Sequence, residues 1–305
     1  MPELKRILLT GSSGFVGTHV LAAWERGDFG EGVDFVCPPP GWDLRDSRAV
    51  QSWISAAAPT AVIHLAAQSF VPRSFEAPEE TFDINLSGTL RLLQALNSTG
   101  FRGRLLYVSS GDIYGSVPVD ALPVDESRAP EPRSPYAVSK WAAEQLCLQW
   151  HRSEGMDVVV ARPFNHVGPG QARQFALPSM AGQIVACMDG RQDAVHVGNI
   201  EITRDFTDVR DVVRAYANLL DHGHAGQTYV IGSGIERSLR SILQDICRIA
   251  GISPSIIHDP ARMRASEQTR MRADPTRLRA HTGWEPTVPF DVTLTDILTD
   301  ARNNP

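Results

Sequence analysis

A glycine-rich segment near the start of the chain restricts the fold more than any other feature. Gly11, Gly14 and Gly17 directly follow the β-rich run at residues 6–10 and open a predicted helix. At such a turn the first glycine permits a tight bend, the second lets the backbone approach a ligand, and the third allows close helix–strand packing. Free N–H groups at the helix start favour phosphate groups. The segment therefore predicts a dinucleotide-binding turn; the alternative is an ordinary flexible turn with packing glycines.

Short β-rich runs alternate with helical stretches in the first half of the chain. The runs lie at residues 6–10, 33–36, 61–65, 104–108 and 157–161, and apolar residues such as Leu90, Leu93 and Leu96 recur between them at helical spacing. Strands that alternate with helices are typical of βαβ units with right-handed crossovers. The sequence predicts an α/β fold with a doubly wound parallel sheet of the Rossmann type.

The pattern loosens after Pro163. A helix is expected near residues 208–220 and one more strand at 228–231, followed by short helices and proline-rich turns. We therefore expect a dinucleotide-binding domain at residues 1–165 that returns at about 206–232. A smaller interleaved C-terminal lobe would comprise residues 166–205 and 233–305.

Charge and composition exclude several classes of protein. The net charge is −6 and the isoelectric point is near 5.8, so no overall field attracts nucleic acid or an anionic membrane. The chain has no apolar run long enough to span a bilayer and no signal-peptide pattern at its start. Its four cysteines are far apart and have no histidine cluster nearby, so no metal site is expected. These features predict a cytoplasmic protein with a small-molecule partner.

Tyr136 and Lys140 are the candidate chemical core. They lie four residues apart at the start of a predicted helix, which places both side chains on one face. A neighbouring ammonium stabilises a phenolate and lowers the pKa of the phenol toward the working range. Ser110, which follows the strand at 104–108, supplies a hydroxyl that could hold a carbonyl oxygen beside the tyrosine. By itself a Tyr/Lys pair at this spacing is common on solvated helices; its combination with the glycine turn favours catalysis.

The cofactor preference rests on the segment after the second strand. Asp43 and Leu44 follow that strand and are candidates to recognise adenine; in the alternative, Asp43 or Asp46 caps a helix. An NAD-binding chain is expected to carry a carboxylate at the end of this strand, but here Cys37 and prolines follow. Without that carboxylate a 2′-phosphate meets no repulsion, so we expect NADPH, with NADH as the alternative.

These motifs together resemble the extended short-chain dehydrogenase/reductases. In the first half the resemblance is carried by the glycine turn with Phe15, His64-Leu-Ala-Ala67, Val108-Ser-Ser110 with Tyr114-Gly115, and Tyr136-x-x-x-Lys140. The second half is similar to the nucleotide-sugar members of that family in the runs at 162–170, 197–216, 259–264 and 282–286. The resemblance covers almost the whole chain. It implies NAD(P)H-dependent reduction of a GDP-linked 4-keto-6-deoxyhexose, with a nucleotide-sugar 4,6-dehydratase or epimerase as the alternative.

The resemblance also implies roles for individual residues. Tyr136 would donate a proton to the sugar O4, Lys140 would bind the nicotinamide ribose, and Ser110 would orient the keto oxygen. The residues implied to bind the cofactor are Gly11, Gly14, Phe15, Val16, Gly17, Asp43, Leu44, Leu65, Ala66, Ala67, Tyr136 and Lys140. Those implied to bind the substrate are Asp112, Asn165, Gln183, Arg204 and Arg264. His64 and His166 are interpreted as structural.

Asp112 separates the two leading activities. Dehydratases of this family need a base at the sugar C5 and carry glutamate two residues after the catalytic serine or threonine, where this chain has Asp112. A base that is displaced by about 1 Å can lose ~100-fold in rate, so the shorter side chain favours reduction. A second departure is Ala265, which stands where the family pattern usually has proline.

Two helical segments predict the assembly. Residues 79–96 and 136–150 carry apolar side chains on more than one face, among them Leu92, Leu93, Trp141, Leu146 and Trp150. In relatives these helices form the four-helix bundle of a dimer. The sequence therefore predicts a homodimer; the alternative is that all these side chains pack inward.

Overall fold

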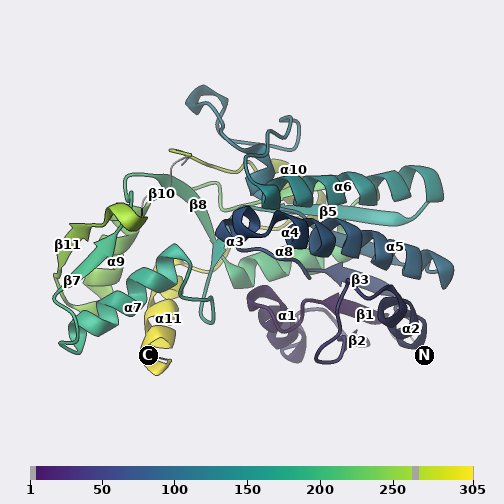
Figure 1. The fold of residues 1–305 in the computed structure, drawn as a ribbon, viewed down its shortest axis with the longest axis horizontal. Helices are drawn as coiled ribbons and strands as arrows, with labels where there is room; N and C mark the ends of the chain where they lie inside the picture. Colours follow the sequence, from purple (N-terminus) through teal and green to yellow (C-terminus); the bar gives the residue numbers. More distant parts are fainter. Residues whose placement is uncertain (1–4, 263–267, 305) are drawn as a thin grey trace.

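The computed structural model describes residues 5–262 and 268–304, which form two lobes (Figure 1). The larger lobe is built on a six-stranded parallel sheet with the order β2-β1-β3-β4-β5-β9. Its strands are β1 (Lys5–Thr10), β2 (Val33–Val36), β3 (Ala61–His64), β4 (Arg104–Val108), β5 (Asp157–Pro163) and β9 (Thr228–Ile231). The predicted doubly wound α/β fold is confirmed.

Helices cover both faces of this sheet. Alternate side chains point to opposite faces, so Ile7 and Leu9 pack in one core while Leu8 packs in another. One face is covered by α1 (Phe15–Glu25) and α8 (Val209–His222), and the other by α2 (Ser47–Ala57), α5 (Gly88–Ser98) and α6 (Pro135–Glu154). Burial on both faces explains why the strands read as continuous apolar runs.

The order of the strands determines where a ligand fits. β1 pairs with β2 on one side and with β3 on the other. The order of the strands across the sheet therefore reverses its direction between β1 and β3. In open α/β sheets the crevice for a ligand lies at such a reversal, beyond the carboxyl ends of the strands. The glycine turn follows β1 at this edge.

The smaller lobe, which contains the C-terminus, packs helices on short strands (Figure 1). Its helices are α7 (Ala176–Met188), α9 (Leu239–Ala250) and α11 (Phe290–Asn303). Its strands are β6 (Asn165–Val167), β8 (Thr203–Asp208) and β10 (Glu236–Ser238) in one sheet, and β7 (Ala194–Val197) and β11 (Ser255–His258) in another. A separate apolar core, which includes Ile184, Ile242 and Leu294, holds the three helices together.

Short elements complete the structure. They are α3 (Val71–Glu76), α4 (Pro78–Phe82), the π-helical turn η1 (Asp83–Ser87), the 3₁₀ turns η2 (Gly111–Tyr114), η3 (Val119–Ala121) and η4 (Pro260–Arg262), and α10 (Thr276–Thr282). The π-helical turn connects α4 directly to α5. Such turns are rare and occur frequently beside functional sites.

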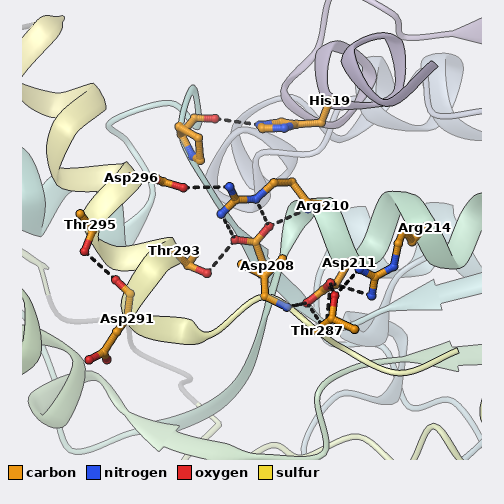
Figure 2. A network of polar contacts seen from close by, with 12 residues as sticks. His19, Asp208, Arg210, Asp211, Arg214, Thr287, Asp291, Thr293, Thr295 and Asp296 are labelled. Atoms are coloured by element: carbon orange, nitrogen blue, oxygen red, sulfur yellow. Dashed lines mark hydrogen bonds and ion pairs between the residues drawn. The ribbon is translucent and has the colours of Figure 1, made fainter. Parts of the chain in front are cut away.

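A polar network ties the two lobes together (Figure 2). Asp208 caps α8 by accepting from the backbone N–H of Arg210, and its carboxylate also accepts from the Thr293 hydroxyl of α11 at 2.6 Å. Arg210 pairs with Asp208 and with Asp296 of α11, both at 2.8 Å. Asp211 accepts from the backbone N–H of Thr287, which precedes α11. A helix of the larger lobe is therefore fixed to a helix of the smaller one.

Candidate active site

The glycine turn has the geometry that the sequence predicts. Gly11 has φ +74°, which favours glycine, and a Cβ atom on it would lie 2.8 Å from the backbone nitrogen of Ala66. A Cβ atom on Gly17 would lie 2.2 Å from the carbonyl oxygen of Gly11. Both glycines therefore keep the first turn of α1 close against the end of β1 and the loop after β3.

The start of α1 is suited to an anion. The helix begins after Gly14 without a side-chain cap and has no acidic residue in its first turn. Its first N–H groups and the positive end of the helix dipole therefore face the adjoining space. This arrangement fits a pyrophosphate, as the sequence predicts.

A cavity of about 1040 Å³ lies between the glycine turn and the smaller lobe. It brings together eight of the predicted cofactor residues from the two loops, which are Gly11, Gly14, Phe15, Val16, Gly17, Leu65, Ala66 and Ala67. Ser110, Tyr136 and Lys140 line the same cavity. A concave site of this size, with a few polar side chains gathered in it, is suited to binding small-molecule ligands.

Local structure explains how the three catalytic candidates meet. β4 ends at Val108, and Ser110 caps the short turn η2 by accepting from the N–H of Asp112 at 3.1 Å. Ser134 caps α6, so the helix starts one residue before Tyr136. Tyr136 and Lys140 then project from one face of α6 and are 9% and 4% exposed. The fold therefore brings Ser110, Tyr136 and Lys140 together at one cavity.

The electrostatics of Tyr136 differ from the expectation. Burial raises the pKa of the phenol well above its usual value, the charge of Asp112 raises it further, and hydrogen bonding with Ser110 lowers it. We expected Lys140 to bring this pKa down. Instead the loss of solvent around the phenolate dominates, so Tyr136 is a neutral phenol at neutral pH and is suited to donate a proton.

Lys140 is perturbed in the opposite direction. Burial lowers the pKa of its ammonium to about 8, although the nearby Cys147 and Glu144 oppose the change. Its Nζ lies 4.7 Å from the centroid of the Tyr107 ring, a cation–π contact that helps to hold the side chain in place. A buried lysine with a pKa near neutrality is characteristic of a functional site.

Four predicted substrate residues also line the cavity, namely Asp112, Asn165, Gln183 and Arg204. Arg264 lies outside the described residues. The Gln183 side chain is occupied by the protein: its amide donates to the carbonyl of His196 and accepts from the N–H of His196 at 3.1 and 2.8 Å. Gln183 therefore fixes strand β7 against α7 and also lines the cavity.

Asp43 and Leu44 are not among the residues that line the cavity. Asp43 forms an ion pair with Arg45 at 2.6 Å. Leu44 is buried in the core beneath α5, where its Cβ lies 2.9 Å from the position of a Cβ on Gly88. Asp46, the alternative helix cap, does cap α2 by accepting from the N–H groups of Arg48 and Ala49.

Sequence analysis did not identify several lining residues. Tyr216 of α8 lines the cavity, is fully buried, and its hydroxyl has no hydrogen-bond partner among the described residues. Phe70 and Phe175 also line the cavity and meet edge to face, with ring centroids 6.0 Å apart. The helical spacing of apolar residues around Tyr216 could predict that its side chain is buried. It could not predict that Tyr216 lines the cavity, because the other lining residues lie far from it in the sequence.

Within residues 5–262 and 268–304, no three side chains of His, Cys, Asp or Glu are grouped so that they could hold a metal ion. The helices in the same ranges are all too short or too polar to cross a bilayer.

Comparison with known proteins identifies the family. Residues 41–297 match the family described as GDP-mannose 4,6 dehydratase. The chain belongs to this family. Its predicted place among the nucleotide-sugar short-chain dehydrogenase/reductases is thereby confirmed.

Curated relatives of this family include reductases and dehydratases. The chain is 47% identical over 304 residues to a GDP-6-deoxy-D-mannose reductase of Pseudomonas aeruginosa, covering 97% of each protein. It is 32% identical to a dTDP-glucose 4,6-dehydratase of Streptomyces niveus, covering 98% of this chain and 93% of the relative.

Solved structures agree with this placement. RMD from Pseudomonas aeruginosa, complexed with NADPH, superimposes with a TM-score of 0.93 at 44% identity, covering 99% of this chain and 100% of that one. A Thermus thermophilus UDP-glucose 4-epimerase in complex with NAD superimposes with a TM-score of 0.84 at 31% identity, covering 97% and 99%. The two neighbours therefore bind different nicotinamide cofactors on one fold.

Proposed function

We propose that this chain is an NADPH-dependent reductase that converts GDP-4-keto-6-deoxy-D-mannose to GDP-D-rhamnose. The observation that carries the proposal is the convergence of Ser110, Tyr136 and Lys140 with the glycine turn in one cavity. The 47% identity to a GDP-6-deoxy-D-mannose reductase over 97% of both chains supports the choice of substrate.

The cofactor proposal rests on the turn and on the second strand. The first turn of α1 would hold the pyrophosphate, and β2 ends at Val36 and is followed by Cys37 rather than by a carboxylate. The Cys37 thiol is hydrogen-bonded to the Ser12 side chain of the glycine turn. The neighbour complexed with NADPH supports the same preference. Measuring turnover with each reduced cofactor tests it, and faster turnover with NADH would contradict it.

In the proposed reaction the bound cofactor supplies a hydride to C4 of the sugar, and the protein supplies a proton to O4. Tyr136, a neutral phenol, donates this proton and becomes a phenolate. The Ser110 hydroxyl donates a hydrogen bond to the keto oxygen and so places it beside Tyr136. The ammonium of Lys140 binds the nicotinamide ribose and stabilises the phenolate as it forms.

The substrate side of the cavity is proposed to bind the diphosphate and the sugar. Asn165 begins β6 and Arg204 lies on β8, so both reach the cavity from one sheet of the smaller lobe. A guanidinium and an amide are suitable donors for phosphate oxygens. Arg264 is proposed to join them, as the family resemblance implies.

The competing activity is 4,6-dehydration. It is favoured by the family match and by the dehydratase relatives. Asp112 lines the cavity and acts electrostatically on Tyr136, so a carboxylate is present near the reacting centre. We assign Asp112 to the wall of the substrate site because it is one methylene shorter than the glutamate of the dehydratase pattern.

One experiment separates the two activities. The purified protein is incubated with GDP-mannose and NADP⁺, and separately with NADPH and GDP-4-keto-6-deoxy-mannose made by an added 4,6-dehydratase. We expect reduction in the second incubation and no 4-keto-6-deoxy product in the first, as followed by mass spectrometry. Asp112→Asn should retain much of the reduction. If the protein alone forms the ketone from GDP-mannose and Asp112→Asn abolishes this, the dehydratase assignment replaces ours.

We also propose a division of labour between the lobes. The dinucleotide-binding part would comprise residues 1–165 and about 206–232, and the nucleotide-sugar part 166–205 and 233–305. This division is supported by the separate apolar cores of the larger sheet and of helices α7, α9 and α11.

A cytoplasmic homodimer is proposed for the assembly. Leu92 and Leu93 are fully buried within this chain, so they do not favour a partner. Trp141 and Trp150 of α6 are only half-buried, and Val138 is exposed on the same helix. Light scattering at micromolar concentration tests the proposal, and a strictly monomeric mass would contradict it.

A further inference from the structure

A buried chain of hydrogen bonds runs beneath the cavity, from the glycine turn to helix α5. Thr10, the last residue of β1, is joined by its hydroxyl to Nδ1 of His64 at 2.7 Å. Nε2 of His64 is joined to the hydroxyl of Thr89 at 3.0 Å, and that hydroxyl donates to the carbonyl of Asn85 at 2.6 Å. The four side chains are at most 1% exposed. Water therefore cannot replace any of these bonds at low cost.

The direction of every bond in this chain can be assigned. A carbonyl oxygen only accepts, so the single proton of the Thr89 hydroxyl goes to Asn85 and its oxygen must accept from His64. His64 is therefore protonated on Nε2, and in the neutral ring Nδ1 accepts from the Thr10 hydroxyl. The Thr10 oxygen in turn accepts from the N–H of Ala66 at 3.2 Å. All donors and acceptors along this path are matched.

The charge state of His64 agrees with this assignment. Burial lowers the pKa of the imidazole to about 3, and the nearby Lys140 ammonium contributes in the same direction. A neutral ring has one donor and one acceptor, which are the two functions that Thr89 and Thr10 require.

Asn85 extends the chain to the catalytic helix. It lies in the π-helical turn between α4 and α5, and its side chain exchanges hydrogen bonds with the backbone of Gln68 at 2.8 and 3.0 Å. The same amide donates to the Ser139 hydroxyl at 2.9 Å, and Ser139 donates to the carbonyl of Tyr136 at 2.7 Å. The glycine turn, the loop that carries Ala66, and the start of α6 are thus linked in series.

We propose that His64, in its neutral Nε2–H form, is a positioning residue that sets the distance between the dinucleotide and the Tyr136/Lys140 pair. Ala66 is at one end of this series of hydrogen bonds and Tyr136 is at the other, and both residues line the cavity. A displacement of about 1 Å between reacting groups can cost ~100-fold in rate, so a relay that fixes this distance matters for hydride transfer. The inference rests on the proposed reductase activity.

Substitution of Thr89 tests the relay. Thr89→Val keeps the shape of the side chain but removes both the acceptor for His64 and the donor to Asn85, whereas Thr89→Ser keeps the hydroxyl. Thr207→Val is the matched control, because Thr207 is 3% exposed and its hydroxyl has no hydrogen-bond partner among the described residues. All three variants are compared with the wild type in the full-length protein.

We expect Thr89→Val to lower kcat about 10-fold with little change in KM for the nucleotide sugar. The kinetic isotope effect with NADPH deuterated at the transferred position should rise, because hydride transfer becomes slower relative to other steps. Thr89→Ser should restore most of kcat, and Thr207→Val should resemble the wild type. Equal losses in the Val and Ser variants, equal losses in Thr89→Val and Thr207→Val, or an unchanged kcat in Thr89→Val would each overturn the proposal.

A second measurement needs neither turnover nor a folded variant. In wild-type protein labelled with ¹⁵N-histidine, we expect the His64 resonances at pH 7 to show a proton on Nε2 and a bare Nδ1. A proton on Nδ1, or on both nitrogens, would overturn the proposal. If the tautomer is as assigned but the protein does not reduce GDP-4-keto-6-deoxy-mannose, then the proposed function fails and the hydrogen-bond assignment remains.

Discussion

The two sides of the active-site cavity are built by different means. On the dinucleotide side the contacts come from backbone geometry within a few residues of the chain, namely the turn from Gly11 to Gly17 and the uncapped start of α1. On the side proposed to bind the nucleotide sugar, the lining consists of side chains on separate elements, such as Asn165 on β6 and Arg204 on β8. A binding site that is built from the backbone of one short segment can be predicted from a sequence motif. A binding site that is built from side chains on separate elements cannot be predicted in this way.

Hydrogen bonds inside the larger lobe are more deeply buried than an ion pair that joins the two lobes. Behind the dinucleotide side, buried hydrogen bonds from Thr10 to Thr89 link one element to the next. The contact between α8 and α11 in Figure 2 includes the pair of Arg210 and Asp296, which are 30% and 35% exposed. We therefore expect substitutions near the buried chain and the glycine turn to have larger effects than those at the contact between the lobes.

The largest effect is expected at Tyr136, where the two sides meet. Tyr136→Phe removes the proton donor and keeps the ring, so kcat should fall by about 100-fold or more. The affinity for NADPH, measured by fluorescence titration, should change little because the glycine turn is untouched. Near-normal turnover would remove Tyr136 from the mechanism.

Glycine substitutions compare the two sides directly. Gly17→Ala places a Cβ 2.2 Å from the Gly11 carbonyl oxygen, so the turn must shift, and we expect the Kd for NADPH to rise by about 10-fold or more. Gly182→Ala in α7 is the matched control, since the nearest atoms to its Cβ belong to the Arg173 side chain at 3.7 Å or more.

Titration calorimetry measures both variants. Gly182→Ala should leave the Kd for NADPH unchanged, because its helix belongs to the sugar side and alanine is the better helix former. If the two substitutions weaken NADPH binding equally, the contrast between a backbone-built side and a side-chain-built side is wrong.

The pH dependence tests the role of Lys140 on the dinucleotide side. With a pKa of about 8, its ammonium is present below that pH and is lost above it. We expect kcat/KM to be constant below about pH 8 and to fall above it, because the protonated form is required to bind the ribose and to stabilise the phenolate. Tyr136, whose pKa is raised, stays protonated in this range.

The variant Lys140→Arg identifies the titrating group. Guanidinium does not titrate in this range, so the variant should have a lower kcat/KM that no longer falls between pH 8 and 9.5. A basic limb that persists unchanged in Lys140→Arg would assign the titration to another residue.

The smallest effect is expected at the contact between the lobes. Asp296→Asn removes one of the two partners of Arg210, and such a partly exposed pair contributes about 0.2–1 kcal/mol to the free energy of unfolding. Urea denaturation should show this small loss, with kcat within about twofold of the wild type. A loss well above this range would show that the lobes depend on this contact far more than its exposure indicates.

Much of the fold and of the catalytic group could be predicted because the signals are local. The strands at 33–36, 104–108 and 228–231 coincide with β2, β4 and β9. In β4 and β9 the runs of apolar residues reflect burial in the core of the sheet. The four-residue spacing of Tyr136 and Lys140 determines their common helix face in any packing. The sequence did not show that the loop after the edge strand β2 turns the Leu44 side chain into the core beneath α5, because that contact depends on a distant element.

The sequence by itself determined the individual strands, the glycine turn and the Tyr/Lys pair, because each depends on residues that lie close together along the chain. Only the tertiary structure decided that burial raises the pKa of Tyr136, that Gln183 serves the backbone of β7, and that His64 is a neutral donor to Thr89. In each of these cases the partner comes from a different element or from the surrounding core. Desolvation and hydrogen-bond pairing depend on that spatial neighbourhood, and no spacing along the chain encodes it.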